Sequence, residues 1–176
     1  MPRITRLLLM FIAVLLNACS SAPLESYQAT TPIFKPETFF EGELKAYGIV
    51  LDRNGSLTRR FTVDIDASWS DGVGEIKEWF VYDDGEKATR TWIMTKQPDG
   101  TYTGTAGDVI GEASGAAAGS VFYWRYDLTI QVDGDDLTVT LDDWMYLVTE
   151  SKLLNKSDII KFGFKVGEVI LVIERV

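Results

Sequence analysis

The sequence predicts an all-β fold, an antiparallel up-and-down meander barrel of about ten strands. Three observations predict it. From Phe39 onward, apolar and polar residues alternate with a period of two, which is typical of strands that bury one face. Short turn sequences rich in glycine and aspartate separate the alternating segments. Nearly every connection is a hairpin, so consecutive strands should pair, and closure into a barrel would remove the two exposed edges.

The chain begins with a predicted signal peptide, residues 1–18. Arg3 and Arg6 precede an apolar run that is shorter than the roughly 20 residues needed to span a bilayer. The run ends in the four residues LNAC, of which the last is Cys19, and this motif resembles the lipobox of bacterial lipoproteins. The resemblance implies that the leader is cut before Cys19, that the cysteine carries diacylglycerol, and that the new amino terminus is acylated with a fatty acid such as palmitate.

A lipidated Cys19 would hold the protein on a membrane. Each buried methylene contributes roughly 0.8 kcal/mol, so two or three acyl chains would make the anchor almost irreversible. The next residue is Ser20 rather than aspartate, which by resemblance to sorted lipoproteins favours the outer membrane of a Gram-negative cell, with the protein facing the periplasm. The alternative is an ordinary secreted protein with a free thiol at its terminus.

Charge and composition exclude several classes of function. The net charge of the whole chain is −9, and it becomes −11 when Arg3 and Arg6 leave with the signal peptide. Such a surface repels nucleic acid and anionic lipid headgroups, so we expect no nucleic-acid partner and a membrane attachment that depends on the acyl chains.

The sequence contains no histidine and a single cysteine. This excludes Ser-His-Asp and Cys-His catalysis, zinc sites built from these residues, and a disulfide bond. An enzyme would be left with carboxylates, a Ser-Lys pair or a bound cofactor. We therefore expect a protein that is not an enzyme and that uses neither a metal nor a cofactor.

Residues 19–37 are predicted to form a flexible tether between the lipid anchor and a barrel domain of residues 38–176. This segment contains Pro23, Pro32 and Pro36 among small polar residues, and it shows no periodicity. Prolines at these positions disfavour the alternative, a strand of the barrel.

The first strands follow in order. Residues 40–50 alternate, a turn lies at 52–55, and a half-buried strand occupies 61–69. The next two strands, 76–82 and 88–97, are joined by the three residues Asp-Asp-Gly, which suit a hairpin with glycine in the left-handed conformation.

That hairpin loop predicts the register of the two strands it joins. It sets Glu78 opposite Arg90, so a charged pair lies on the face that otherwise carries apolar residues such as Trp92. The following turn places Met94 beside Gly104, a large side chain against none, as interdigitating packing requires.

Residues 109–120 carry glycine or alanine at alternate positions, which fall on one face of a strand. One interpretation is a bend or a close approach of backbone where the sheet curves. Another is that the missing side chains leave room for a ligand. A phosphate-binding loop is disfavoured because no Gly-Lys-Ser/Thr follows and the chain is acidic.

Residues 121–147 are the clearest hairpin of the chain, with a turn at Gly134. The apolar phase becomes ambiguous at residues 142–144, which indicates a bulge. We expect residues 153–157 to form a loop.

The last hairpin is predicted over residues 159–176, with its turn at Gly167 and Glu168 and with Phe162 and Phe164 on its apolar face. A barrel of about eight to ten strands can hold one small ligand. A membrane barrel is disfavoured because the second face of the strands carries Arg, Asp, Lys and Glu, which lipid would not tolerate.

Five blocks of the sequence carry a resemblance: FFEG at 39–42, Gly48 with the DR at 52–53 and Gly55, RRF at 59–61, DWMY at 143–146, and KFG at 161–163. They are similar to the recurring blocks of an uncharacterised proteobacterial lipoprotein family, domain of unknown function 3833. The resemblance covers nearly the whole mature chain. It implies a lipocalin-like (calycin) barrel, no established activity, and no catalytic residues that could be transferred.

The candidate ligand-binding residues lie on the predicted inner face of the barrel: Glu78, Arg90, Trp92, Met94, Trp124 and Tyr126. The charged pair could bind a polar headgroup or a fatty-acid carboxylate, and its alternative is a satisfied internal pair that fixes strand register. The aromatic residues and the methionine could line an apolar pocket, and their alternative is ordinary core packing.

Two further pairs are weaker candidates. Asp142 and Asp143 could bind a cation or act as acid and base, but a solvated bulge is the favoured interpretation because no ligand-spacing motif accompanies them. Arg59 and Arg60 start a strand and are interpreted as surface residues or partners of the acidic excess.

The sequence leads to three functional hypotheses. The first is a lipid-anchored barrel that binds a fatty acid, lipid or other hydrophobic molecule. The second is a structural lipoprotein with a solid barrel whose rim binds another envelope protein, which the sequence does not identify. The third, disfavoured by the missing histidine and cysteine, is a lipid-modifying enzyme that uses carboxylates alone.

Overall fold

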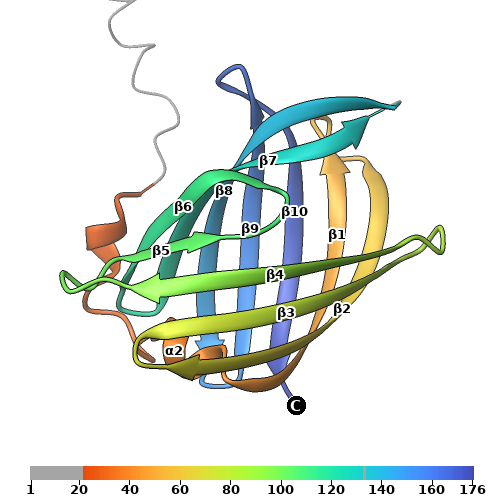
Figure 1. Cartoon of the computed structure of the whole chain (residues 1–176). Coiled ribbons are helices and arrows are strands. Elements are labelled where there is room, and N and C mark those ends of the chain that lie inside the picture. Colours follow the sequence, from red (N-terminus) through yellow and green to blue (C-terminus); the bar gives the residue numbers. More distant parts are fainter. Residues whose placement is uncertain (1–21, 133) are drawn as a thin grey trace, which may run out of the picture.

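The structure, a computed structural model, describes residues 22–132 and 134–176. The predicted signal peptide and Cys19 lie outside these residues. Ten antiparallel strands form a closed barrel, in which each strand pairs with its neighbours in sequence and β1 pairs with β10 (Figure 1). The strands are β1 (Gly42–Asp52), β2 (Leu57–Ser70), β3 (Val73–Tyr82), β4 (Lys87–Lys96), β5 (Tyr102–Thr105), β6 (Val109–Ala118), β7 (Val121–Val132), β8 (Asp135–Thr149), β9 (Lys152–Lys161) and β10 (Phe164–Arg175). The predicted meander barrel is therefore confirmed.

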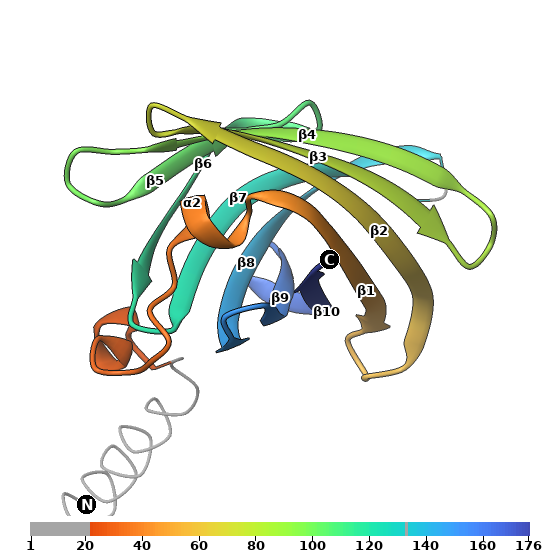
Figure 2. The same ribbon diagram turned by 90° about the horizontal axis from the view of Figure 1, so that it is seen from below.

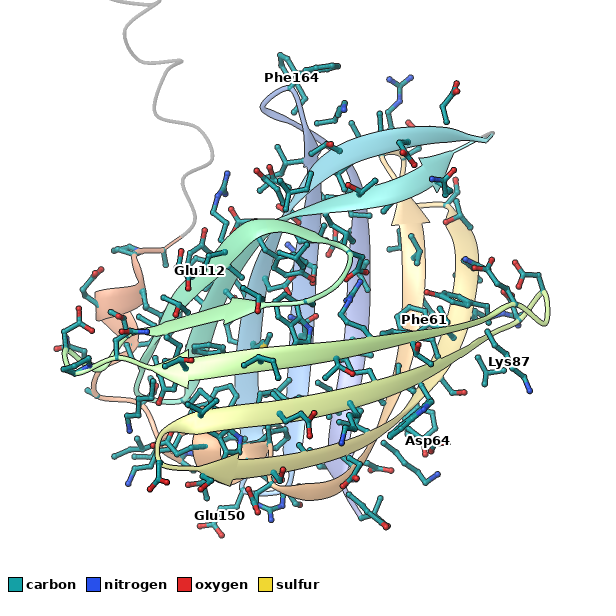
Figure 3. All side chains as sticks on the ribbon, viewed as in Figure 1. Phe61, Asp64, Lys87, Glu112, Glu150 and Phe164 are labelled. Carbon is teal, nitrogen blue, oxygen red and sulfur yellow. The ribbon has the colours of Figure 1, made fainter. Side chains whose placement is uncertain are left out.

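The two faces of the strands follow the alternation in the sequence. On β2, Phe61 lies on the inner face and is buried, whereas Asp64 lies on the outer face and is exposed (Figure 3). The predicted register of the hairpin β3–β4 is confirmed, because Glu78 pairs with Arg90. Met94 pairs with Gly104 as predicted. None of the helices among the described residues is both long and apolar enough to cross a bilayer.

Gly104 of β5 and Gly115 of β6 are explained by close packing rather than by room for a ligand. The ring of Trp124 lies so close to Gly104 and Gly115 that a Cβ there would come within 2.9 Å and 2.7 Å of it. A register shift between Ile110 and Ser114 marks a bulge in β6, as the predicted bend requires. The space left by the missing side chains is therefore filled by an aromatic ring.

Two predictions for β8 and β9 are wrong. No register shift occurs at residues 142–144, which pair regularly with β7, and the irregularity of β8 lies between Leu147 and Thr149 instead. Residues 153–157 are part of β9 rather than a loop. In both places polar residues stand on the inner face, and the sequence-based interpretation mistook them for an interruption of the strand.

The predicted turn of the last hairpin is also wrong. The chain turns at Phe162 and Gly163, whose φ values of 51° and 81° are left-handed, as a two-residue hairpin turn requires. Gly167 lies within β10. Phe162 and Phe164 are 87% and 74% exposed at the tip of this hairpin rather than packed on an apolar face (Figure 3).

The predicted tether needs correction for the residues that the structure describes. A short 3-10 helix, η2 (Leu24–Tyr27), precedes a short helix, α2 (Pro36–Phe39). Between them Phe34 is 2% exposed, and its backbone N–H donates to the carbonyl of Gly119 over 2.7 Å. Figure 2 shows the barrel from below, and α2 lies across this lower end of the barrel. The residues from Phe34 to Phe39, which include Pro36, therefore cover this end of the barrel and bury the rings of Phe34 and Phe39. We call this segment the plug.

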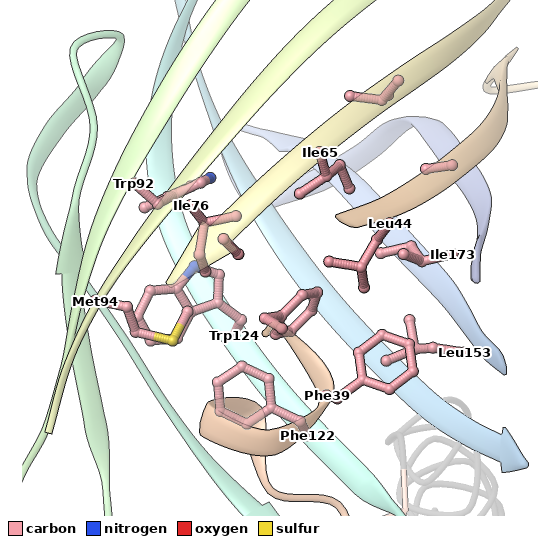
Figure 4. Packing of buried hydrophobic residues seen from close by; sticks show 14 of the residues in the cluster. Phe39, Leu44, Ile65, Ile76, Trp92, Met94, Phe122, Trp124, Leu153 and Ile173 are labelled. Carbon is pink, nitrogen blue, oxygen red and sulfur yellow. The ribbon is translucent and has the colours of Figure 1, made fainter. Parts of the chain in front are cut away.

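The hydrophobic core lies at the end of the barrel that α2 covers. Figure 4 shows Phe39 of α2 among Phe122, Leu44 and Leu153. Phe34 packs edge-on against Phe39 and Phe122, with ring centroids 5.6 Å and 5.7 Å apart. The largest side chains that are fully buried in the described part of the chain are Trp124, Phe34, Phe122, Leu44, Leu153, Val121 and Pro36.

Candidate ligand-binding site

The barrel contains a cavity of about 220 Å³ above this core. Its walls are mainly apolar and aromatic, with Phe61, Phe80 and Tyr82 on one side and Leu128 and Leu141 on another. A cavity of about 150 Å³ is enough to bind benzene, and typical ligand pockets measure about 300–1,000 Å³. The space suits a small apolar molecule, or part of a longer one.

All six residues singled out from the sequence line this cavity: Glu78, Arg90, Trp92, Met94, Trp124 and Tyr126. The strands bring them together because residues at alternate positions share the inner face, so β4 supplies three of them and β7 supplies two. That they bind a ligand stays a prediction.

The aromatic residues serve as both wall and core. Trp92 contacts Trp124 and Tyr126 edge-on, with ring centroids 5.8 Å and 5.1 Å apart. Trp124 is only 2% exposed, so most of its surface packs against protein, whereas Tyr126 is half-buried beside the cavity. The two interpretations of these residues, pocket and core, therefore both apply.

The charged pair has a third member that sequence reasoning missed. Arg90 lies opposite Glu78, but its Nη1 is 4.0 Å from Oε2 of that residue. Asp108, just before β6, accepts three hydrogen bonds from the guanidinium at 2.6–3.0 Å. The alternative interpretation was that Glu78 and Arg90 satisfy each other inside the barrel. The structure does not fit it, because the Arg90 guanidinium hydrogen-bonds to Asp108 instead of Glu78.

The cavity wall includes three more polar side chains, Asp143, Asn155 and Ser157; the first was a weaker candidate interpreted as part of a solvated bulge, and the other two were missed. They are 5%, 3% and 4% exposed, which contradicts a solvated bulge at Asp143. Ser157 donates from Oγ to Oδ1 of Asn155 over 3.0 Å. The signal that could have found Asp143 is the uninterrupted alternation that places it on the same face as Leu141 and Leu147.

Of the weaker candidates, Asp142, Arg59 and Arg60 lie outside the cavity, whereas Asp143 lines it. Asp142 points outward and pairs with Arg125 at 2.6 Å. Arg59 pairs with Asp84 and Glu86 at the rim of the barrel, as expected for an arginine that balances some of the many surface acids. Among the described residues no group of three or more His, Cys, Asp or Glu side chains is arranged to hold a metal ion.

Burial dominates the electrostatics of the two acidic groups in the cavity wall. It raises the pKa of Glu78 to about 7, although Arg90 favours the charged form. Burial also raises the pKa of Asp143 to about 7, against the opposing effects of Ser157, Arg90 and Tyr126. Both carboxyls therefore titrate near neutral pH, in contrast to surface acids.

The fold has counterparts among solved structures. An S-type phycobiliprotein lyase, CPES, from Guillardia theta aligns with a TM-score of 0.59 and 11% identity over 88% of this chain and 98% of that chain. The odorant binding protein OBP1 aligns with a TM-score of 0.35 and 18% identity over 83% of this chain and 77% of that chain. The first similarity confirms the predicted lipocalin-like barrel.

The sequence comparisons agree with the resemblance noted above. No curated protein matches the chain. A family model described as "Protein of unknown function (DUF3833)" matches residues 13–175, which is nearly the whole chain. The protein is therefore a member of the DUF3833 family, whose function is unknown.

Proposed function

We propose that this protein binds a small hydrophobic or amphipathic molecule inside its barrel, at the periplasmic face of the outer membrane. The observation that carries the proposal is the cavity of about 220 Å³ with aromatic walls and a few polar side chains. Such a combination is typical of small-molecule sites, in which apolar walls provide affinity and polar groups provide orientation. A solid structural barrel would not need this space, and empty space in a core is costly.

Anchoring through acyl chains on Cys19 is part of the proposal, and its support is the signal peptide and the lipobox-like LNAC. Hydrophobic molecules partition between a bilayer and the water around it. A binding protein anchored to that bilayer would therefore lie close to its supply of ligand. The acidic surface gives no electrostatic reason for membrane attachment, so the acyl chains would have to supply it.

The binding proposal can be tested by filling the cavity. Ala46 lines the cavity and is 1% exposed, so Ala46→Leu places additional methyl groups in that space. Tyr47→Leu changes the next residue of β1, on the outer face, and serves as the matched control. Binding of 1-hexanol would be followed through the fluorescence of Trp92 and Trp124, and native mass spectrometry of the purified protein would look for a molecule that copurifies.

We expect saturable binding to the natural protein, at least tenfold weaker binding to Ala46→Leu, and unchanged binding to the control variant. Absence of saturable binding, or equal binding by both variants, would refute a ligand site in the barrel.

A carboxylate-dependent enzyme is the second candidate, and one observation favours it. Two carboxyls with pKa values of about 7, Glu78 and Asp143, face a common cavity, and general acids and bases work best with pKa values near the working pH. The two candidates differ in the fate of the ligand. A binding protein releases it unchanged, whereas an enzyme converts it and loses turnover in Asp143→Asn.

A further inference from the structure

Polar groups from four strands meet in the wall of the cavity. Glu78 and Arg90 come from β3 and β4, Asp143 comes from β8, and Asn155 and Ser157 come from β9. The strands β3 and β9 are distant in sequence, and only closure of the barrel gives them a common interior. This polar wall consists of one cation, two carboxyls, one amide and one hydroxyl.

The cation of the polar wall is already engaged. Arg90 makes three hydrogen bonds with Asp108, through Nε and Nη2. Asp108 occupies Nε and Nη2, so a ligand carboxylate would find only Nη1, which lies 4.0 Å from Oε2 of Glu78. The fatty-acid carboxylate expected from the sequence would therefore meet an arginine that already faces two carboxyls of the protein, Glu78 and Asp108.

The carboxyls of the polar wall, in contrast, have unused hydrogen-bonding capacity. Three buried atoms of the polar wall have no hydrogen-bond partner among the described residues, and two of them are carboxyl oxygens: Oε2 of Glu78 and Oδ1 of Asp143, with the amide Nδ2 of Asn155 as the third. Asp143 is only 5% exposed, and buried polar atoms of this kind are normally paired. Both oxygens are acceptors when the carboxyls are ionised, so the group that would satisfy them is a hydrogen-bond donor.

We infer that the cavity binds an apolar molecule with a cationic, hydrogen-bond-donating head, such as a primary alkylamine, in preference to a carboxylate of the same chain length. The inference rests on the proposed function and specifies its ligand class. An ammonium group has three donors and no acceptor, which complements the unpartnered oxygens of Glu78 and Asp143. The ring of Tyr126 also lines the cavity, and aromatic rings attract cations, whereas the Trp92 ring already has Arg90 5.9 Å from its centroid.

The preference depends on pH in a defined direction. The groups that act on Glu78 are Arg90, Asp108 and Asp143, and those that act on Asp143 are Ser157, Arg90, Asp142 and Tyr126. Because burial raises the pKa of both acids to about 7, the ionised fraction of each rises between pH 6 and pH 8. Amine binding should therefore strengthen between these pH values, and carboxylate binding should weaken.

The experiment compares three probes of equal chain length: hexylamine, 1-hexanol and hexanoate. The mature lipidated protein in phosphatidylcholine vesicles is titrated with each probe at pH 6 and pH 8, with Trp fluorescence as the readout. Glu78→Gln and Asp143→Asn remove the charges with nearly unchanged shape. Asp66→Asn removes a carboxylate from the exposed outer face of β2 and is the matched control. Circular dichroism verifies that each variant is folded.

We expect hexylamine to bind at least tenfold more tightly than hexanoate at pH 8, with 1-hexanol between them. The advantage should fall at least fivefold in Asp143→Asn and Glu78→Gln and remain in Asp66→Asn. Equal or tighter binding of hexanoate overturns the inference and leaves the proposed function standing. An amine preference that survives in both cavity variants shows attraction to the acidic surface and also overturns it. Failure of all three probes to bind overturns the proposed function and the inference together.

Discussion

The hydroxyl of Tyr102 on β5 donates a hydrogen bond of 2.6 Å to the carboxylate of Glu37 in α2. This bond joins the plug to the wall of the barrel, and Lys96 of β4 pairs with the other oxygen of the same carboxylate. Burial opposes ionisation of Glu37, but the hydrogen bonds from Lys96 and Tyr102 outweigh it, so its pKa is lowered. The plug is thus held by charge-assisted contacts as well as by aromatic packing.

The first prediction concerns this contact. Tyr102→Phe should lower the free energy of unfolding by roughly 1 to 3 kcal/mol at pH 7, because a hydrogen bond to a charged group is lost. Since the pKa of Glu37 is lowered in the fold, this contribution should disappear as the pH falls through the acidic range. Urea unfolding measures it at pH 7 and at a series of acidic pH values that extends well below 4.5, the ordinary pKa of a glutamate. Tyr47→Phe, at a site that is 47% exposed, is the control and should have little effect.

The second prediction concerns the buried acids. The folded-state pKa values of Glu78 and Asp143 are raised to about 7, so the folded protein binds more protons than the unfolded chain at mildly acidic pH. Stability from these groups is therefore lost as the pH rises toward 7. Glu78→Gln and Asp143→Asn should each be more favourable relative to the natural protein at pH 8 than at pH 5, by roughly 2 to 3 kcal/mol.

Urea unfolding at the two pH values measures this difference. Asp66→Asn, on the outer face, should shift stability equally at both pH values. If the cavity variants behave in the same way as this control, the two acids are not perturbed by burial.

The third prediction concerns the turn at Phe162. Its φ of 51° is left-handed, which asparagine accepts more readily than a β-branched residue does. Both Phe162→Asn and Phe162→Val remove the exposed ring, so the difference between them isolates the backbone term. We expect the asparagine variant to be more stable by about 1 to 2 kcal/mol in thermal or urea unfolding.

The same pair of substitutions at Phe164 tests the interpretation. Phe164 lies in a strand, where valine is favoured, so Phe164→Val should be at least as stable as Phe164→Asn. A preference for asparagine at position 164 and not at 162 would contradict the turn.

The fourth prediction concerns membrane attachment. Cys19→Ala removes the thiol that would carry the acyl chains, so the protein should move from the membrane fraction to the soluble periplasmic fraction. Ser20→Asp, by resemblance to sorted lipoproteins, should keep the lipid and redirect the protein to the inner membrane. Cell fractionation on a density gradient distinguishes these outcomes. Retention of Cys19→Ala in the membrane would exclude the anchor.

Local sequence was sufficient for much of the fold. Alternation with a period of two identified the strands, and the three-residue loop of the hairpin β3–β4 defined the pairing of Glu78 with Arg90. Turn sequence alone failed in the last hairpin, where Gly163 and Gly167 were both plausible turn residues. Pairing of β10 with β1, which sets Val169 against Val50, excludes a turn at Gly167.

The candidate site was predicted in part for the same reason. Its apolar and aromatic residues followed from the strand phase. Asn155 and Ser157 were missed, and Asp143 was interpreted as part of a bulge, because polar residues on an inner face look like an interruption of a strand. Asp108 was missed because its turn carries no signal of a partner. These side chains acquire their role only when the barrel closes and brings β8, β9 and the turn before β6 around one interior.

The sequence by itself therefore predicted most of the strands and their order, and it led to the proposal of a lipid anchor, since these depend on local patterns of a few residues. Only the tertiary structure showed that part of the proline-rich segment covers one end of the barrel. It also showed that Arg90 hydrogen-bonds to Asp108 and that buried carboxyls line a cavity. The physical reason is that burial and partnership depend on contacts between distant segments, and a periodic pattern contains no information about which distant segments meet.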